Sequence, residues 1–457
     1  MKSVNLNPEQ RQAVSKMITW FMADKEQFFI LSGAGGTGKT TILTELVEQL
    51  HEHSRFFADV NQGHPKEREF RNVKVYVSAT QNDPVSGLRA AGFTQATTIY
   101  SLLGLKLQPD YNGSYRIVTS EDHRAKIDGL VQGKNVVIID EASHMNHMLY
   151  TMLVRYKIRS IFVGDAAQLR SVNKDSVHND FFIFDYQSHI PSFNLTINNR
   201  AQTQTLAEMN QELREAVLSG HQTSILDNGK DVRVLSDDDY KQTLEQYSLK
   251  YPEPDQVKVL TFHNYAAHRY NNFCRKVMNK PPYLEVGDVV LANNYYESFK
   301  YIDTPSCSYR SSARIPITAV NPTEAHKGLF QHGPFLDDTY MINASGLAVP
   351  VYVWKKPSVR KNILADLKEE ALKLKKEGAE SRAINTAWKT FYAASQNVLD
   401  FRYHHSETTH KSQGRTYDWV FIDVPDLLQA RVHDTIRRLI YVAFSRAKYG
   451  VFIRHHK

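Results

Sequence analysis

The feature that most constrains the fold of this chain is a glycine-rich stretch near its N-terminus. The stretch reads Gly33-Ala34-Gly35-Gly36-Thr37-Gly38-Lys39-Thr40 and fits the pattern G-x-x-x-x-G-K-[ST]. The apolar run 28–31 before it predicts a buried strand, and residues 41–47 after it predict a helix. Glycines let the backbone curl around an anion, so that consecutive N–H groups and the helix N-terminus face phosphates. The stretch therefore predicts a nucleotide-phosphate loop; the alternative is a glycine-rich turn that binds nothing.

Two further features indicate what would happen to a nucleotide held in this loop. Lys39 supplies a mobile positive charge for the β- and γ-phosphates, and the Thr40 hydroxyl suits a Mg²⁺ ion. The apolar run 136–139 is typical of a central parallel strand, and it ends in Asp140 and Glu141. We expect Asp140 to hold Mg²⁺ and Glu141 to polarise an attacking water. The sequence therefore predicts hydrolysis with ATP and Mg²⁺ as cofactors, although acids at a strand end are sometimes only solvated loop residues.

The order of predicted elements indicates an α/β protein of more than one domain. Alternating strands and helices predict a doubly wound α/β domain over residues 1–190. A second α/β unit is expected over 191–283 and 400–457, interrupted at 284–399 by a β-rich stretch followed by charged helices. Within the first domain, Asn112-Gly113 predicts a hairpin at about 104–120, and the polar stretch 51–72 predicts a surface excursion.

Composition bounds the class of protein. The 457 residues carry a formal net charge of +7, which weakly favours a polyanionic partner. Only Cys274 and Cys307 are present, so neither a disulfide framework nor a cysteine-based metal site is expected. No apolar run reaches the roughly 18 residues that a membrane-spanning helix needs. We expect a cytoplasmic protein that does not associate with membranes.

The motifs, taken in order along nearly the whole chain, resemble those of superfamily 1 helicases. The resemblance is to the RecD-like 5′→3′ branch, and within it most closely to the Dda-type helicases of phages. It is strongest at 33–41, 139–143, 163–169, 408–415 and 439–448. It implies two tandem RecA-like P-loop domains, a strand-separating β-hairpin pin in the first, and an SH3-like β-barrel with a helical tower inserted in the second. A phage-encoded protein of this kind would act in the host cytoplasm.

The resemblance also implies the remaining nucleotide contacts. Gln10 matches a glutamine that contacts adenine, and Gln168 matches one that senses the γ-phosphate. Arg200 and Arg446 match two arginines that neutralise the γ-phosphate, both expected on the second unit, so that hydrolysis requires the two units to close. The other implied nucleotide contacts are Thr41, Gln413 and Gly414.

On the nucleic-acid side, the resemblance implies contacts from both units. Thr80, Asn264, Thr409 and His410 match residues that track phosphates. Tyr100 stands where the family has a histidine, and we expect it to stack on a base. The residues expected to act in the pin are Pro109 and Tyr115; the alternative is a plain solvent hairpin. The stretch Ser78-Ala79-Thr80-Gln81-Asn82-Asp83-Pro84 departs from the family pattern of Ala-Pro-Thr followed by small residues.

The resemblance implies an ATP- and Mg²⁺-dependent DNA helicase that translocates 5′→3′ on single-stranded DNA and unwinds duplexes. The implied partners are single-stranded DNA and duplex junctions, with a single-strand-binding protein or replication, repair or recombination proteins as further partners of a monomeric motor. Three alternatives stay open. The first is an RNA-directed or nucleoprotein-remodelling ATPase with the same ATP-hydrolysing domains. The others are a P-loop phosphotransferase acting on a small metabolite and a non-hydrolysing binding module. Residue chemistry alone does not separate DNA from RNA, since the motor contacts backbone more than bases.

Overall fold

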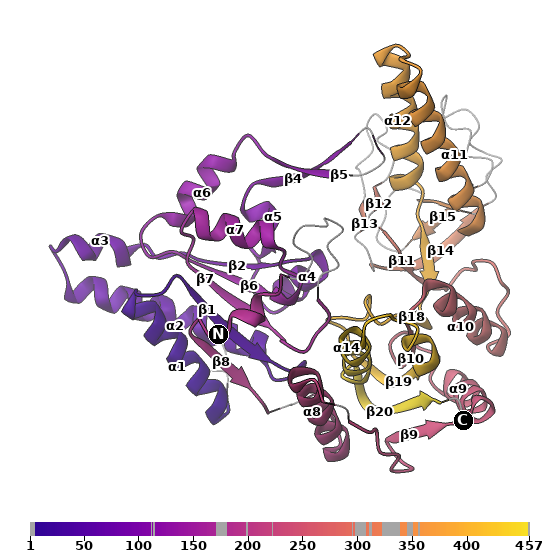
Figure 1. Ribbon diagram of the computed structural model, residues 1–457, viewed down its shortest axis with the longest axis horizontal. Coiled ribbons are helices and arrows are strands. Elements are labelled where there is room, and N and C mark those ends of the chain that lie inside the picture. The colour runs from indigo at the N-terminus through magenta and orange to yellow at the C-terminus, as the bar shows by residue number, and fades with distance from the viewer. Residues whose placement is uncertain are drawn as a thin grey trace.

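The computed structural model places two parallel β-sheets in two adjacent halves of the molecule (Figure 1). The residues it describes are 5–110, 112, 115–170, 181–197, 200–221, 223–294, 296–297, 308–309, 313–321, 339–344, 351–354 and 357–455. No helix among them combines the length and the apolar character needed to cross a membrane.

The first domain is built on a six-stranded parallel sheet in the order β3-β2-β6-β7-β1-β8. Its strands are β1 (Phe28–Gly33), β2 (Val75–Ala79), β3 (Thr97–Thr98), β6 (Val136–Asp140), β7 (Ser160–Gly164) and β8 (Ser192–Leu195). Its helices are α1 (Pro8–Ala23), α2 (Lys39–Val60), α3 (Pro65–Arg71), α4 (Asn82–Ala90), α5 (Ile99–Leu102), α6 (His123–Val131) and α7 (His147–Arg155), with short 3-10 turns η1 (Ala142–His144) and η2 (Ile183–Tyr186).

Helices cover both faces of this sheet, as the alternating pattern predicts. Successive residues of β6 point to opposite faces: Val136 and Ile138 pack in the cluster that includes α1, α2 and α4. Val137 and Ile139 pack in the cluster of α5, α6 and α7. Because β6 lies between β2 and β7, it is the buried central strand expected from its apolar run.

Two segments of the first domain differ from their expected extent. The polar stretch 51–72 is helical: it continues α2 to Val60 and adds α3, and the Phe57 and Phe70 rings lie 4.5 Å apart where these helices meet. Strand β8 pairs with β1, so the first sheet extends past residue 190, where we expected the second domain to begin. A sequence pattern does not show with which sheet a short strand pairs.

The second domain has a five-stranded parallel sheet in the order β18-β10-β19-β20-β9. Its strands are β9 (Val232–Leu235), β10 (Val257–Thr261), β18 (Ser406–Thr408), β19 (Tyr417–Asp423) and β20 (Ala447–Arg454). Its helices are α8 (Gln204–Ser219), α9 (Asp237–Lys250), α10 (Asn264–Val277), α13 (Val424–Leu427) and α14 (His433–Phe444). Helices α8 and α14 pack on one face and α9 and α10 on the other, so this domain is also doubly wound.

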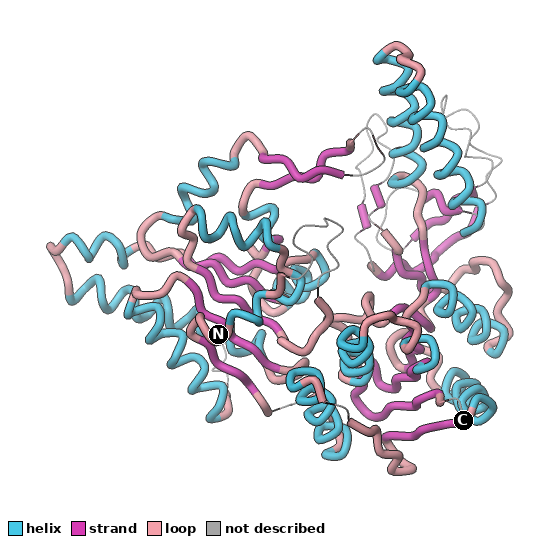
Figure 2. Tube along the Cα trace, viewed as in Figure 1, coloured by secondary structure: helices cyan, strands magenta, loops and turns pink. Residues whose placement is uncertain are grey.

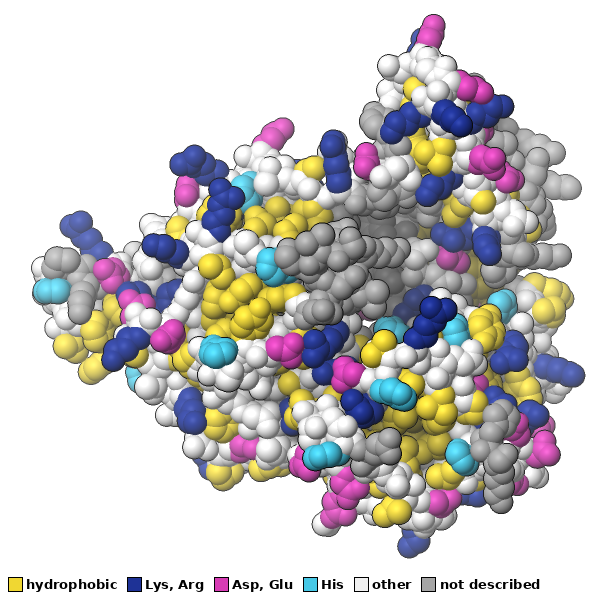
Figure 3. All heavy atoms as spheres, in the orientation of Figure 1, with side chains coloured by type: hydrophobic (Ala, Val, Ile, Leu, Met, Phe, Trp, Pro, Cys, Tyr) yellow, Lys and Arg dark blue, Asp and Glu magenta, His cyan; other side chains and the backbone are white. Residues whose placement is uncertain are grey.

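The insertion contains an antiparallel sheet in the order β16-β15-β14-β11-β17, joined to two long helices. Its elements are β11 (Val289–Ala292), β14 (Arg314–Asn321), β15 (Thr339–Ala344), β16 (Val351–Trp354), β17 (Phe401–Tyr403), the short pair β12 (Tyr296–Glu297) and β13 (Ser308–Tyr309), and helices α11 (Pro357–Lys376) and α12 (Ser381–Gln396). The two helices project from the body as an antiparallel pair (Figure 2). On the face seen in Figure 3, basic and acidic side chains alternate over this pair. Its description as an SH3-like barrel with a tower stays a prediction.

The predicted hairpin is present. Strands β4 (Leu105–Pro109) and β5 (Tyr115–Thr119) pair antiparallel and extend from the first domain toward α12 (Figure 1). At its end the hairpin touches α12, because the Asp110 N–H donates to the Tyr392 hydroxyl at 3.2 Å and that hydroxyl donates to the Asp110 carbonyl at 2.7 Å. The turn residue Gly113 and the side chains of Pro109 and Tyr115 lie outside the described residues, so their expected role as a pin stays a prediction.

Candidate active site and nucleic-acid pocket

The phosphate loop has the backbone that its glycines predict. It joins β1 to α2, and Gly36 and Gly38 adopt φ angles of 91° and 82°, a region that residues with a side chain rarely adopt. The Lys39 ammonium donates to the carbonyls of Gly33 at 2.8 Å and Ala34 at 2.9 Å. Burial lowers the pKa of Lys39, and the nearby carboxylates of Asp165, Glu141 and Asp140 oppose that effect. The amine is thus held at the loop, close to Asp140 and Glu141, with which it would share a nucleotide.

Gln10 supports the loop from α1. Its side-chain amide donates to the Thr37 carbonyl at 3.0 Å, and its carbonyl oxygen accepts the Asn7 N–H at 3.0 Å in a capping box at the start of the helix. In this arrangement both ends of the amide are bonded within the protein. Each end of the amide keeps one further hydrogen-bonding site, and the contact of Gln10 with adenine stays a prediction.

The acidic pair lies where β6 ends. The Asp140 carboxylate accepts the Glu141 N–H at 2.9 Å, and burial together with the neighbouring Glu141 charge raises the pKa of Asp140 to about 6. Glu141 adopts a left-handed conformation with φ of 48°, and its Oε2 atom is buried with no hydrogen-bond partner in the described structure. An oriented carboxylate oxygen without a protein partner suits a general base that must accept a proton from water.

The same corner suits a magnesium ion. Asp140 and Thr40 both line the cleft at the phosphate loop and offer a carboxylate and a hydroxyl oxygen, which are hard donors. Among the described residues, no group of three or more His, Cys, Asp or Glu side chains is placed to hold a metal. Mg²⁺ is commonly held by one or two protein oxygens, with phosphates and water completing its shell.

Two arginines approach the phosphate loop at Gly35. A Cβ atom at this position would lie 2.8 Å from Arg200 Nη1 and 3.4 Å from Arg446 Nη2, so glycine leaves the space that the guanidinium groups occupy. Arg200 Nη1 also donates to the Ser445 carbonyl at 3.0 Å. Burial and the adjacent Arg446 charge lower the pKa of Arg200 to about 10. The structure thus brings together the two side chains that the resemblance assigned to the γ-phosphate.

The arginines reach the loop by different routes. Arg446 follows α14 in the second domain, as expected, but Arg200 lies in the connection between β8 of the first sheet and α8. The expectation that both arginines belong to the second unit stays a prediction for Arg200, which lies in the connection between the two sheets and is bonded to Ser445 of the second domain.

Gln168 lies between the motifs of the two domains. It is almost fully buried, and its side-chain carbonyl accepts from Ser143 Oγ at 3.5 Å and from Gln413 Nε2 at 3.4 Å. Gln413 and Gly414 follow β18 of the second domain and line the nucleotide cleft. The cleft has a volume of about 1000 Å³. The predicted residues that line it are Gly35, Gly36, Gly38, Lys39, Thr40, Thr41, Asp140, Glu141, Gln168, Arg200, Gln413, Gly414 and Arg446.

A second pocket of about 740 Å³ lies on the other side of Glu141. Three predicted nucleic-acid residues line it: Thr80, Tyr100 and His410. The Thr80 hydroxyl donates to the Glu141 carbonyl at 2.9 Å, which ties this pocket to the acidic pair. Glu141, Gln413 and Gly414 line both hollows, so the two sites share a wall.

The other two predicted contacts lie outside the lining of this pocket. The Thr409 hydroxyl is fully buried and donates to the Thr261 carbonyl at 3.2 Å, so it joins β10 to the end of β18. Asn264 is exposed at the first position of α10. Sequence reasoning missed His144, which lines the pocket three residues after Glu141 and is close enough to Gln413 for a side-chain hydrogen bond. The sequence signal that could have identified it is its position three residues after the acidic pair.

Comparisons with known proteins agree with this arrangement. A family model described as an AAA domain matches residues 5–237, and one described as a UvrD-like helicase C-terminal domain matches residues 404–453. The uncharacterized protein R530 of Acanthamoeba polyphaga mimivirus is 20% identical, with 96% of this chain and 98% of that protein covered. The RecBCD enzyme subunit RecD of Haemophilus influenzae is 28% identical over 34% of this chain and 24% of its own length.

Solved structures show the same fold. The Bacteroides Pif1 helicase in complex with ADP-AlF3 and ssDNA has a TM-score of 0.50 at 15% identity, with 98% of this chain and 92% of that chain covered. A structure of two coordinating Pif1 helicases that unwind forked duplex DNA gives the same values. The likeness therefore spans both α/β domains and the insertion.

Proposed function

We propose that this chain, which belongs to the AAA-domain family and is a helicase-like ATPase of superfamily 1, unwinds DNA by translocating 5′→3′ on a single strand. The observation that carries the proposal is the approach of Arg446 to the phosphate loop: both line the same cleft, and Arg446 Nη2 lies 3.4 Å from where a Cβ atom on Gly35 would be. An arginine from the second domain completes a site whose lysine and acids come from the first, so hydrolysis depends on the spacing of the two domains. An arginine finger of this kind is typically worth about 10³–10⁵ in rate.

In the proposed cycle, Mg²⁺-bound ATP lies in the cleft of about 1000 Å³. Bound Mg²⁺ neutralises phosphate charge, and Asp140 and Thr40 are placed to hold it. Lys39 leaves the carbonyls of Gly33 and Ala34 to pair with the phosphates, and the free Glu141 oxygen accepts a proton from the attacking water. Loss of the γ-phosphate would remove an anion shared by Lys39 of the first domain and Arg446 of the second, and the domains would separate.

The strand would lie in the pocket lined by Thr80, Tyr100 and His410, which comes from both domains. Its shared wall with the nucleotide cleft gives a direct route from ATP state to strand contacts. The Pif1 helicase of similar fold was solved with ssDNA, which favours DNA as the substrate. We further propose that the β4–β5 hairpin acts as a strand-separating pin, that the insertion is an SH3-like module, and that the protein is a Dda-type motor that works as a monomer, alone or with a single-strand-binding protein.

An unwinding assay tests activity and polarity together. Duplexes carrying a single-stranded tail at the 5′ or the 3′ end are compared in the presence of ATP and Mg²⁺. Unwinding of the 5′-tailed duplex alone is expected. Unwinding of the 3′-tailed duplex alone would overturn the proposed direction.

A second assay tests the substrate by measuring ATP hydrolysis with matched DNA and RNA oligonucleotides. Stimulation by RNA that equals or exceeds stimulation by DNA would overturn the DNA assignment. Hydrolysis indifferent to both polymers would favour a phosphotransferase, and absence of hydrolysis would favour a binding module.

A further inference from the structure

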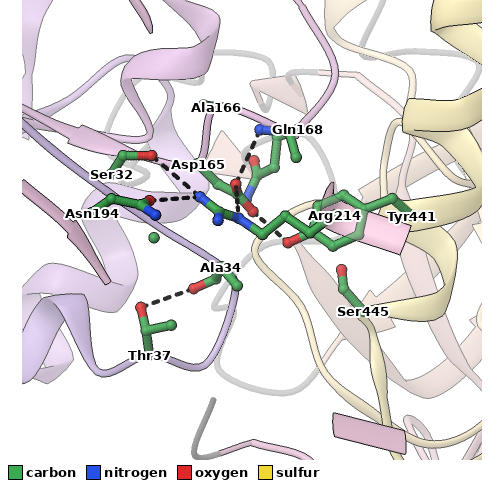
Figure 4. A network of polar contacts seen from close by, with 12 residues as sticks. Ser32, Ala34, Thr37, Asp165, Ala166, Gln168, Asn194, Arg214, Tyr441 and Ser445 are labelled. Atoms are coloured by element: carbon green, nitrogen blue, oxygen red, sulfur yellow. Dashed lines mark hydrogen bonds and ion pairs between the residues drawn. The ribbon is translucent and has the colours of Figure 1, made fainter. Parts of the chain in front are cut away.

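Asp165 is a buried carboxylate at the junction of the two domains, and neither hydrolysis nor strand binding as described above uses it. It follows β7, begins the loop that carries Gln168 and is fully buried. Figure 4 shows it beside Arg214 and Tyr441. Within its own loop, its Oδ1 atom accepts the Ala167 N–H at 3.0 Å. The remaining donors come from outside the first sheet: Tyr441 donates to Oδ2 at 2.6 Å and Arg214 Nε to Oδ1 at 3.2 Å.

Arg214 lies on α8 and fastens this helix to the first sheet. Its side chain is 1% exposed, and its Nη2 atom donates to Asn194 Oδ1 on β8 at 2.9 Å and to Ser32 Oγ on β1 at 3.4 Å. Ser32 directly precedes Gly33, where the phosphate loop begins. One guanidinium group therefore joins α8, the strand that feeds the phosphate loop, and the loop of Gln168.

Helix α14 adds a second set of donors to the same loop. Arg438 Nη1 donates to the carbonyls of Ala166 at 2.8 Å and Gln168 at 2.7 Å, and Asp434 accepts from its Nε at 2.8 Å. Tyr441 lies one helical turn further along, and the helix ends just before Arg446. The segment that delivers Arg446 to the phosphate loop thus also holds the backbone and the carboxylate of the Gln168 loop.

We propose that Asp165 is an interdomain latch through which Tyr441 and Arg214 position Gln168 when α14 approaches the first domain. The inference rests on the proposed function, because it concerns the same cleft. Separation of α14 from the first domain would withdraw the Tyr441 hydroxyl from Asp165, and the carboxylate would lose that hydrogen bond. The Gln168 loop therefore has one stable arrangement when the donors are present and another when they withdraw. Asp165, Tyr441 and Arg214 are positioning residues, since they act on the nucleotide only through Gln168.

Tyr441→Phe tests the latch, because it removes one donated hydrogen bond and keeps the ring. The matched control is Tyr240→Phe, which makes the same change at a fully buried tyrosine whose hydroxyl has no partner in the described structure. The measurement is ATP hydrolysis with and without oligo(dT). For Tyr441→Phe we expect kcat in the presence of oligo(dT) to fall about tenfold, as for a lost bond to a charged acceptor, with the KM for ATP within twofold of wild type. Tyr240→Phe should have the same kcat and the same KM for ATP as wild type.

Failure of the latch differs from failure of the proposed function. Wild-type protein whose hydrolysis ignores oligo(dT) would contradict the proposed function. If oligo(dT) stimulates hydrolysis by the wild-type protein, and Tyr441→Phe has the same kcat as Tyr240→Phe, the latch alone would be contradicted. Melting temperatures are measured beside the kinetics, and a loss of kcat in a variant that melts with wild type supports positioning.

Two further variants keep the test decisive where Tyr441→Phe folds poorly. Arg214→Lys keeps the charge beside Asp165 but loses the planar fork that also reaches Asn194, so it should retain more of kcat than Arg214→Met. In a Gln168→Ala background, Tyr441→Phe or Arg214→Lys should have little further effect, since the latch acts through that glutamine. Equal kcat values for Arg214→Lys and Arg214→Met would overturn the proposal. So would a fold-loss of kcat from Tyr441→Phe or Arg214→Lys that is the same in the Gln168→Ala background as in the wild type.

Discussion

Replacing Asp140 by asparagine should end ATP hydrolysis and at the same time stabilise the nucleotide-free protein. Asp140 is buried beside Glu141, and these two causes raise its pKa to about 6 from an ordinary value of 3.8. Asparagine keeps an oxygen that accepts the Glu141 N–H but carries no charge. The variant should therefore lose the Mg²⁺ ligand and also escape the cost of burying a second negative charge.

The size and sign of the effect follow from proton linkage. Because the folded-state pKa is raised, the stability that Asp140 contributes is fully present below pH 3.8 and is lost as pH rises through 6. A shift of about two pKa units corresponds to at most about 3 kcal/mol at pH 8. The difference in the free energy of unfolding between Asp140→Asn and wild type should grow in favour of the variant by about 2 kcal/mol between pH 4.5 and 8. For a domain of this size that is a melting-temperature difference of roughly 4–8 °C.

The assay is thermal unfolding of both proteins across this pH range, with and without Mg²⁺. Asp238→Asn is the matched control, because the Asp238 side chain is fully exposed on α9. We expect added Mg²⁺ at pH 8 to stabilise the wild type more than Asp140→Asn. A melting-temperature difference between Asp140→Asn and wild type that is constant with pH, or that shrinks toward pH 8, would refute the reasoning.

Three further perturbations separate the roles of the site. Lys39→Ala should abolish ATP hydrolysis, measured as phosphate release, and a variant that still hydrolyses ATP would contradict the phosphate-loop assignment. Arg446→Lys should lower kcat by about 10³ while binding of a nucleotide analogue stays near wild type, because lysine lacks the planar fork that reaches the phosphate; a weakened analogue binding with unchanged kcat would argue against a finger. Deleting residues 109–116 should spare hydrolysis stimulated by single strands and impair unwinding of a tailed duplex, and equal loss of both would contradict the pin.

The features predictable from the sequence are those that local chemistry specifies. The phosphate loop, the strand ending at Asp140 and the hairpin around Asn112 depend on residues within a short stretch, and the structure has each of them. The alternating strands and helices likewise specify two doubly wound domains, and the structure has two such sheets.

The features that sequence reasoning missed depend on long-range pairing. Whether residues 192–195 join the first or the second sheet is decided by β1, more than 150 residues earlier. The bond between Asp165 and Tyr441 spans 276 residues, and no local pattern marks Arg214 as its companion. The Thr409 hydroxyl donates to the Thr261 carbonyl, since two adjacent strand ends converge there, and its predicted phosphate contact stays a prediction.

The placement of Arg200 just after β8 has a geometric consequence for the opening of the cleft. Leu195 is the last residue of a strand in the first sheet, and Arg200 follows it by five positions. Even a fully extended chain of five residues spans only about 17 Å. The Arg200 backbone must therefore stay within about that distance of the end of β8 in the first domain. Arg446 follows α14 of the second domain and is not tied to the first sheet by a short linker. When the cleft opens, the Arg446 backbone would therefore move with the second domain, whereas the Arg200 backbone would remain within about 17 Å of the first sheet.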